Sequence, residues 1–332
     1  MTTHRRGILA GIAAMPLAAC AKRLAGGDAA TGIERIDPMF DAIVPRGAAV
    51  EVIATGYRWT EGPVWNARDG SLLFSDVPAN VVHRWTPAGG AQPFLDPSGL
   101  AGPIPATIRE AGANGLALDA AGRLVMGDSG TRVVARIDLA TRAKTILCDR
   151  FDGKRFNSPN DVALARDGAI YFTDPPYGLA DGDASPLKEL AFNGVYRLAS
   201  DGTVTLIDDS LSFPNGVALS PDQRTLYVAI SDPERPELLA YPLDAAGNAG
   251  APGVFADFRP GVAAKRPGLP DGLKVDARGT VFATGPGGVH VFSPQGRLLG
   301  RISTGVAIAN CAIAPGYLYL ASSDRIARVR LA

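Results

Sequence analysis

The sequence predicts an all-β fold, a six-bladed β-propeller with four-stranded antiparallel blades. Three observations lead to this prediction. A short segment recurs six times, and each copy starts with an acidic or amide residue followed by two apolar runs around a turn. The copies start about 40–55 residues apart, which is the period of propeller blades. One four-stranded sheet buries little by itself, whereas six sheets packed radially bury both faces of each.

The clearest copy spans residues 114–128 and reads Asn-Gly-Leu-Ala-Leu-Asp-Ala-Ala-Gly-Arg-Leu-Val-Met-Gly-Asp. Its apolar runs flank a turn-like segment, so it predicts a β-hairpin. The blade that it opens is expected to contain four strands, near residues 114–118, 123–128, 133–138 and 144–148.

The residues that open the six copies, here called the opening residues, are all oxygen donors. They are Glu61, Asn114, Asn160, Asn215, Asp271 and Asn310. Because the first strand of a blade is innermost, we expect them to converge at one mouth of the central channel. Carboxylates gathered there repel one another unless a cation lies among them, and carboxylate and amide oxygens suit a hard divalent ion. Taken singly, an Asn-Gly or Asp-Gly pair is more typical of an ordinary turn.

Residues 48–332 are predicted to form the propeller domain. Residues 49–55 alternate like a strand but precede the first repeat, and the last repeat has only three strand-like segments. We therefore expect the N-terminal strand to complete the last blade and close the ring. Residues 21–47 are rich in Ala, Gly and Asp without periodicity, and are predicted to be a flexible tether.

Residues 1–20 are predicted to be an export signal, because Arg5 and Arg6 precede a short apolar stretch. The run that ends at Cys20 resembles a bacterial lipobox, which predicts lipidation of this cysteine, and the paired arginines resemble a twin-arginine signal. An ordinary secretory signal with a chance cysteine is the alternative. The protein is therefore expected to be exported and periplasmic, and to meet a membrane only through an N-terminal lipid.

Composition argues against several other classes of protein. Lys+Arg and Asp+Glu both number 33, so nothing predicts nucleic acid as a partner. We find no Gly-x-Ser-x-Gly segment, which argues against a serine hydrolase of that type. His4, His83 and His290 are scattered along the chain, so no cluster predicts a zinc cage.

Two long loops interrupt the repeats, at residues 96–112 and 175–190. Loops of this length in a compact domain are usually functional or disordered. We expect the second to act as a lid that shapes a pocket, with a plain insertion as the alternative.

Five motifs resemble those of the SMP-30/gluconolactonase/LRE-like family, and they occur in order along residues 48–332. They are Glu61-Gly-Pro-Val-Trp65, Ser158-Pro-Asn-Asp161, Tyr171-Phe-Thr-Asp-Pro-Pro-Tyr-Gly178, Phe213-Pro-Asn-Gly216 and Pro270-Asp-Gly272. The resemblance implies a six-bladed propeller with one catalytic divalent metal at the channel mouth. It also implies hydrolysis of a sugar lactone, with D-glucono-1,5-lactone as the representative substrate.

Matched motif by motif, the resemblance implies particular roles. The implied metal ligands are Glu61, Asn160, Asn215 and Asp271, with Asp271 also the candidate general base. The implied metal is Ca²⁺ first, with Mg²⁺, Mn²⁺ or Zn²⁺ as alternatives. Asn114, Asn160 and Ser158 are the implied substrate contacts, and Ser158 stands where mammalian members carry an arginine. A second departure lies at residues 127–130, near which many bacterial relatives have a histidine.

A divalent ion would polarise the lactone carbonyl while Asp271 takes a proton from the attacking water. The expected partner is therefore a small-molecule lactone, and the oligomeric state is left open. Two alternatives stay open: a paraoxonase-like hydrolase of acyl lactones or aryl esters, and a non-catalytic ligand-binding propeller with a structural metal. An apolar pocket wall would favour the paraoxonase-like enzyme, and a polar wall the sugar lactonase.

Overall fold

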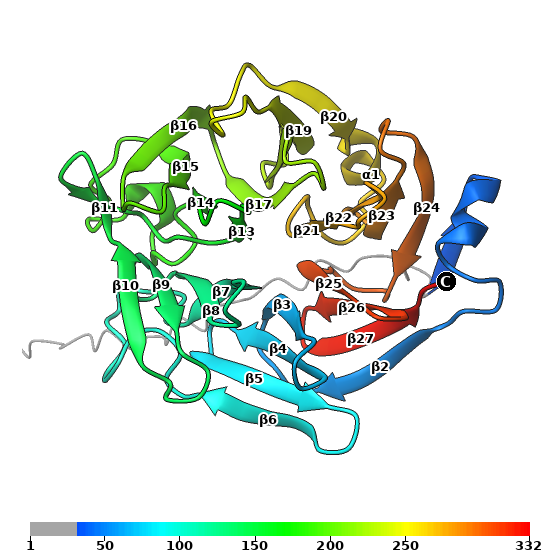
Figure 1. The fold of residues 1–332 in the computed structure, drawn as a ribbon, viewed down its shortest axis with the longest axis horizontal. Coiled ribbons are helices and arrows are strands. Elements are labelled where there is room, and N and C mark those ends of the chain that lie inside the picture. Colours follow the sequence, from blue (N-terminus) through cyan, green and yellow to red (C-terminus); the bar gives the residue numbers. More distant parts are fainter. Residues whose placement is uncertain (1–31) are drawn as a thin grey trace, which may run out of the picture.

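Six antiparallel sheets lie as blades around a central axis in the computed structural model, which describes residues 32–332 (Figure 1). The predicted six-bladed propeller is confirmed. The first strands of neighbouring blades contact one another around the axis, so each blade runs outward from its first strand. These innermost strands are β3 (Thr60–Asn66), β7 (Ala113–Leu118), β13 (Val162–Leu164), β17 (Pro214–Leu219), β21 (Leu273–Val275) and β25 (Asn310–Ala314).

The remaining strands follow in order within each blade. The second strands are β4 (Ser71–Asp76), β8 (Leu124–Asp128), β14 (Ile170–Asp174), β18 (Thr225–Ile230), β22 (Val281–Gly285) and β26 (Tyr317–Ser322). The third strands are β5 (Val81–Thr86), β9 (Val133–Ile137), β15 (Asn193–Leu198), β19 (Glu237–Pro242), β23 (Gly288–Phe292) and β27 (Arg325–Arg330). The outer strands are β6 (Gly90–Leu95), β10 (Lys144–Cys148), β16 (Val204–Leu211), β20 (Gly253–Asp257), β24 (Leu298–Ser303) and β2 (Val50–Thr55).

The second strands are apolar on both faces because each lies between two neighbouring blades. In β4, Leu72 and Phe74 pack into the cluster shared with the last blade. Leu73, pointing the other way, packs into the cluster shared with the second blade. Alternating side chains therefore fill two inter-blade cores from one strand, as the two faces of a sheet require.

The ring closes as predicted, with β2 as the outer strand of the last blade. It pairs antiparallel with β27, with Val50 opposite Val329 and Thr55 opposite Arg325. Strand β2, from the N-terminal part of the described chain, thus lies in one sheet with the C-terminal strand β27 (Figure 1). Without β2, the outer edge of β27 would be left unpaired.

The tether prediction is wrong for residues 32–47. Strand β1 (Gly32–Arg35) pairs antiparallel with β24 and becomes a fifth strand of that blade. The 3₁₀ helix η1 (Pro38–Ala42) follows and buries the ring of Phe40 completely, in a cluster with Leu299. A few apolar side chains hold this segment, and their spacing is too irregular to show in the sequence. The predicted export signal, Cys20 and the rest of the tether lie outside the described residues.

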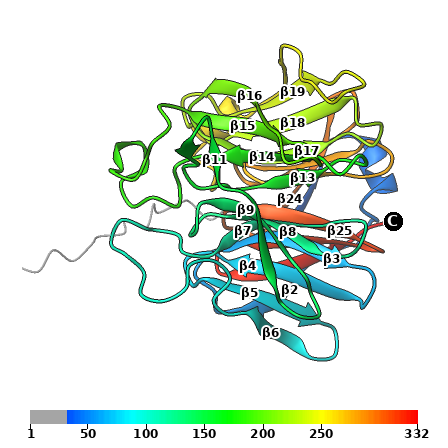
Figure 2. The same cartoon turned by 60° about the vertical axis from the view of Figure 1, so that its left-hand side comes forward.

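The two long loops are hydrogen-bonded to each other. Ile108 and Leu179 form an isolated β-bridge, and the backbone N–H of Arg109 donates to the carbonyl of Gly178 at 2.8 Å. Figure 2 shows the long loops standing out from the ring of blades. The minor elements are the β11–β12 hairpin (Arg150–Phe151 and Lys154–Arg155), η2 (Gly182–Ala184) and α1 (Arg259–Ala263). Within residues 32–332, no helix is long and apolar enough to cross a membrane.

Candidate active site

A cavity of about 920 Å³ opens at one mouth of the central channel. Five of the six opening residues line it: Glu61, Asn114, Asn160, Asn215 and Asp271. All four residues expected to hold a metal therefore line the same cavity. The sixth, Asn310, is turned toward its neighbours. Its Nδ2 donates to Glu61 Oε2 at 3.2 Å, and its Oδ1 accepts from Lys274 Nζ at 3.1 Å.

Glycines after the opening residues allow the inner strands to approach this closely. At Gly62, φ is +51°, and a Cβ there would overlap the backbone carbonyl of Asn114. A Cβ at Gly216 would overlap the carbonyl of Asp271 in the next blade. Only glycine fits such positions, which is why glycine follows four of the six opening residues, at positions 62, 115, 216 and 272.

The Asn215 amide has a defined orientation. The hydroxyl of Ser231, one residue beyond β18, donates to the carbonyl of Pro270, so its oxygen accepts from Asn215 Nδ2 at 2.9 Å. Asn215 Oδ1 is left buried without a hydrogen-bond partner among the described residues. Asn114 Oδ1 is in the same state. Unpaired buried amide oxygens are costly unless a cation or ligand meets them.

Two buried carboxyl groups dominate the electrostatics of the cavity. Burial raises the pKa of Glu61 to about 7, and the nearby Asp161 carboxylate adds to this effect. Burial also raises the pKa of Asp271 well above its usual range, and Glu61 and Asp161 raise it further. Each group disfavours the charge of the other, which is the condition that a bound divalent cation relieves. Oxygen donors of this kind, with no soft ligand among those named above, fit Ca²⁺ or Mg²⁺.

The predicted substrate contact of Ser158 needs correction. Its side chain is fully buried, and its hydroxyl donates to the carbonyl of Pro175 at 2.5 Å. The same oxygen accepts from the backbone N–H of Gly178 at 2.9 Å. Both hydrogen bonds join Ser158 to the loop of residues 175–190, so Ser158 holds this loop in place and does not face the cavity. Asn160, two residues on, does line the cavity.

Sequence reasoning missed most of the cavity wall. Glu110 and Tyr177 come from the two paired loops, so the expectation that the second loop shapes a pocket agrees with its position. The rest of the wall combines apolar side chains with two cationic ones, Lys265 and Arg266. The apolar residues are Trp59, Val262, Pro267, Leu269, Ala307 and Ile308. These segments do not belong to the repeat, and no motif singled them out.

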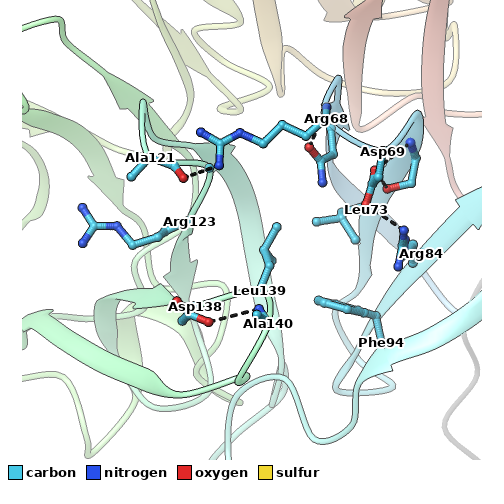
Figure 3. Close-up of a pocket in the computed structure, with 13 residues that line it drawn as sticks. Arg68, Asp69, Leu73, Arg84, Phe94, Ala121, Arg123, Asp138, Leu139 and Ala140 are labelled. Atoms are coloured by element: carbon cyan, nitrogen blue, oxygen red, sulfur yellow. Dashed lines mark hydrogen bonds and ion pairs between the residues drawn. The ribbon is translucent and has the colours of Figure 1, made fainter.

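A second, smaller pocket of about 360 Å³ lies between the first two blades (Figure 3). It is lined by Arg68 and Asp69 in the β3–β4 turn and by Asp138 after β9. This turn is at the end of β3 opposite Glu61, so the pocket opens on the other face of the ring. The Arg68 guanidinium is already bound to the carbonyls of Ala121 and Ala120.

Comparisons with known proteins agree with this geometry. The model of the SMP-30/Gluconolactonase/LRE-like region matches residues 59–324. A gluconolactonase of Zymomonas mobilis is 43% identical over 94% of this chain and 90% of its own length. The solved structure of a gluconolactonase from Xanthomonas campestris is 32% identical, with a TM-score of 0.78 over 91% of this chain and 96% of that one. A calcium-binding protein, regucalcin, from Agrobacterium tumefaciens shares the fold at 20% identity, with a TM-score of 0.66 and coverages of 86% and 95%.

The propeller fold and these relatives define a lactonase, a carboxylic-ester hydrolase that acts on sugar lactones. The chain belongs to the SMP-30/gluconolactonase/LRE-like family, whose model covers the propeller from the first blade to the last.

Proposed function

We propose that the protein hydrolyses a sugar lactone to the aldonic acid with the help of one divalent metal ion, Ca²⁺ first. Glu61, Asn160, Asn215 and Asp271 would hold it. The observation that carries this proposal is the pair of buried carboxyl groups facing a cavity that also holds unpaired amide oxygens. The calcium-binding regucalcin of the same fold is consistent with this assignment. Polarisation of the lactone carbonyl is the chemistry that such an ion supplies when bound.

The protein's own groups move the proton. The water oxygen attacks the carbonyl carbon, and the Asp271 carboxylate accepts the proton that this water releases. As the ring C–O bond breaks, the proton passes to the departing ring oxygen, which leaves as the new hydroxyl group of the aldonic acid. Asn114 and Asn160 line the same cavity and would hydrogen-bond the substrate beside the reacting carbonyl.

The apolar wall supports a second candidate function. Trp59, Leu269 and Ile308 line the cavity, and such a surface suits the chain of an acyl lactone or the ring of an aryl ester. Since the polar groups at the base of the cavity are common to both reactions, a comparison of substrates has to decide between them.

A pH-stat assay separates these candidates. D-glucono-1,5-lactone, a pentonolactone and a long-chain acyl lactone are compared with the spontaneous rate subtracted. Each is measured before and after EDTA, and again with Ca²⁺, Mg²⁺, Mn²⁺ or Zn²⁺ restored. We expect the sugar lactones to react fastest, with activity lost in EDTA and regained with metal. Preference for the acyl lactone would favour the second candidate, and full activity in EDTA would remove the metal from the mechanism.

We also propose that the protein is exported to the periplasm, with Cys20 lipidated. The signal-like composition of residues 1–20 supports this. Fractionation of cells that express the wild type and Cys20→Ser tests it. The wild type should be found with membranes and the variant in the periplasmic fraction. Equal cytoplasmic recovery of both would contradict export.

A further inference from the structure

Glu110 is a partly buried acid in the cavity wall that the proposed metal set does not use. It lies at the end of the first long loop, with its side chain 18% exposed. One carboxyl oxygen, Oε1, is 3.9 Å from the Arg109 guanidinium. The other, Oε2, is buried and has no hydrogen-bond partner among the described residues. An unpaired carboxyl oxygen that borders a cavity is placed to meet a donor on a ligand.

Tyr177 brings a second unpaired group to the same wall. Its ring stacks on Phe213, with centroids 5.9 Å apart and planes 11° apart, so its position is fixed. Its hydroxyl is buried and has no hydrogen-bond partner among the described residues. The nearby Ser231 hydroxyl is already engaged by Asn215 and Pro270.

The paired loops hold these two side chains in place. Glu110 is next to Arg109 and Tyr177 is next to Gly178, the two residues joined by the 2.8 Å backbone hydrogen bond. A second backbone bond, from Ala180 N–H to the Thr107 carbonyl at 3.0 Å, fixes the same pairing. The two polar groups are therefore presented by one hydrogen-bonded unit built from both loops.

We propose that Glu110 and Tyr177 recognise the hydroxyl groups of a polyhydroxylated lactone and thereby set the specificity of the enzyme. A carboxyl group accepts hydrogen bonds from substrate hydroxyls, and a phenol both donates and accepts. The neighbouring wall residues Val262, Leu269 and Ile308 offer no such side-chain group, and Lys265 and Arg266 in the same wall can only donate hydrogen bonds. Selection of a sugar ring over a bare lactone ring would therefore depend on these two residues in addition to Asn114 and Asn160. The inference rests on the proposed cleavage of sugar lactones in this cavity.

Two lactones that differ only in their hydroxyl-bearing substituents test this role. D-glucono-1,5-lactone and δ-valerolactone share the six-membered ring, and δ-valerolactone has no hydroxyl groups. In Glu110→Leu, the kcat/KM ratio of the sugar lactone to the bare lactone should fall ~10- to 100-fold, as expected for lost hydrogen bonds to a carboxyl group. In Tyr177→Phe, the ratio should fall about 2- to 12-fold, because a neutral hydrogen bond is weaker. Ile104→Ala, an exposed position in the same loop, is the matched control.

A binding measurement separates this inference from the proposed function. Calorimetry compares D-gluconate with 5-hydroxyvalerate, the ring-opened form of δ-valerolactone. The Glu110 and Tyr177 variants should weaken gluconate binding selectively. If the wild type cleaved neither lactone, the proposed function would fail. The effect of the variants on gluconate binding would then be the remaining test of the roles of Glu110 and Tyr177. Equal losses on both ligands, or no loss, would overturn it. If Glu110→Leu did not fold, Glu110→Gln and Tyr177→Phe would decide in its place.

Discussion

Replacement of Ser231 by alanine should weaken metal binding without touching a proposed ligand. The Ser231 hydroxyl joins Asn215 Nδ2, at 2.9 Å, to the Pro270 carbonyl next to Asp271. Without it, no other hydrogen bond within residues 32–332 fixes which end of the Asn215 amide faces the cavity. Two hydrogen bonds worth ~0.5–1.5 kcal/mol each give a loss of ~1–3 kcal/mol, or about 5- to 150-fold in affinity. This agrees with the ~10- to 100-fold usual for partners that orient metal ligands.

Calorimetric titration of metal-free protein with Ca²⁺ measures this loss directly. The Ca²⁺-induced rise in Tm gives a second readout, because a bound ligand stabilises the folded state in proportion to its affinity. Ser231→Thr keeps the hydroxyl and should retain most of the affinity. Unchanged Ca²⁺ affinity in Ser231→Ala would refute the idea that this hydroxyl orients Asn215.

Three further predictions concern catalysis, pH and the N-terminal segment. Asp271→Asn should lower kcat at saturating metal by ~10²- to 10⁴-fold with an unchanged circular dichroism spectrum, and near-normal turnover would remove it as the base. Burial lowers the pKa of His290 to about 4, so the unfolded chain takes up a proton at higher pH than the folded protein does. The free energy of unfolding should therefore fall by up to about 3 kcal/mol as pH falls from 6.5 to 4. Urea unfolding across this range should show the loss in the wild type but not in His290→Gln. Phe40→Ala should cost ~3–5 kcal/mol in the same assay, whereas a segment that acted only as a tether would show no effect.

The ring of opening residues could be predicted because each of the six sequence repeats contributes one of them. Six copies in phase outweigh the ordinary turn explanation of any single Asn-Gly pair. The closing strand could be predicted by the same logic, since residues 49–55 are an extra strand and the last repeat lacks one. In both cases, periodicity along the chain translates directly into position around the axis.

The errors have a common physical origin. Strand β1 has only four residues and gains its place from pairing with β24, a partner far along the chain. The direction of the Ser158 hydroxyl is set by a loop whose path follows no repeat. Glu110 and Tyr177 likewise depend on how two insertions pair. Non-repeated loops position side chains through long-range contacts, and no local pattern records these contacts.

The joining of β2 to β27 has a consequence for synthesis on the ribosome. Val50 is made 279 residues before its partner Val329 in β27 (329 − 50 = 279). At ~5–20 residues per second, translation of the intervening chain takes on the order of tens of seconds. During this time a nascent chain displays an unsatisfied strand, which can attract other chains. A premature stop before β27 would make that hazard permanent, so truncation should cause aggregation even when five blades are intact.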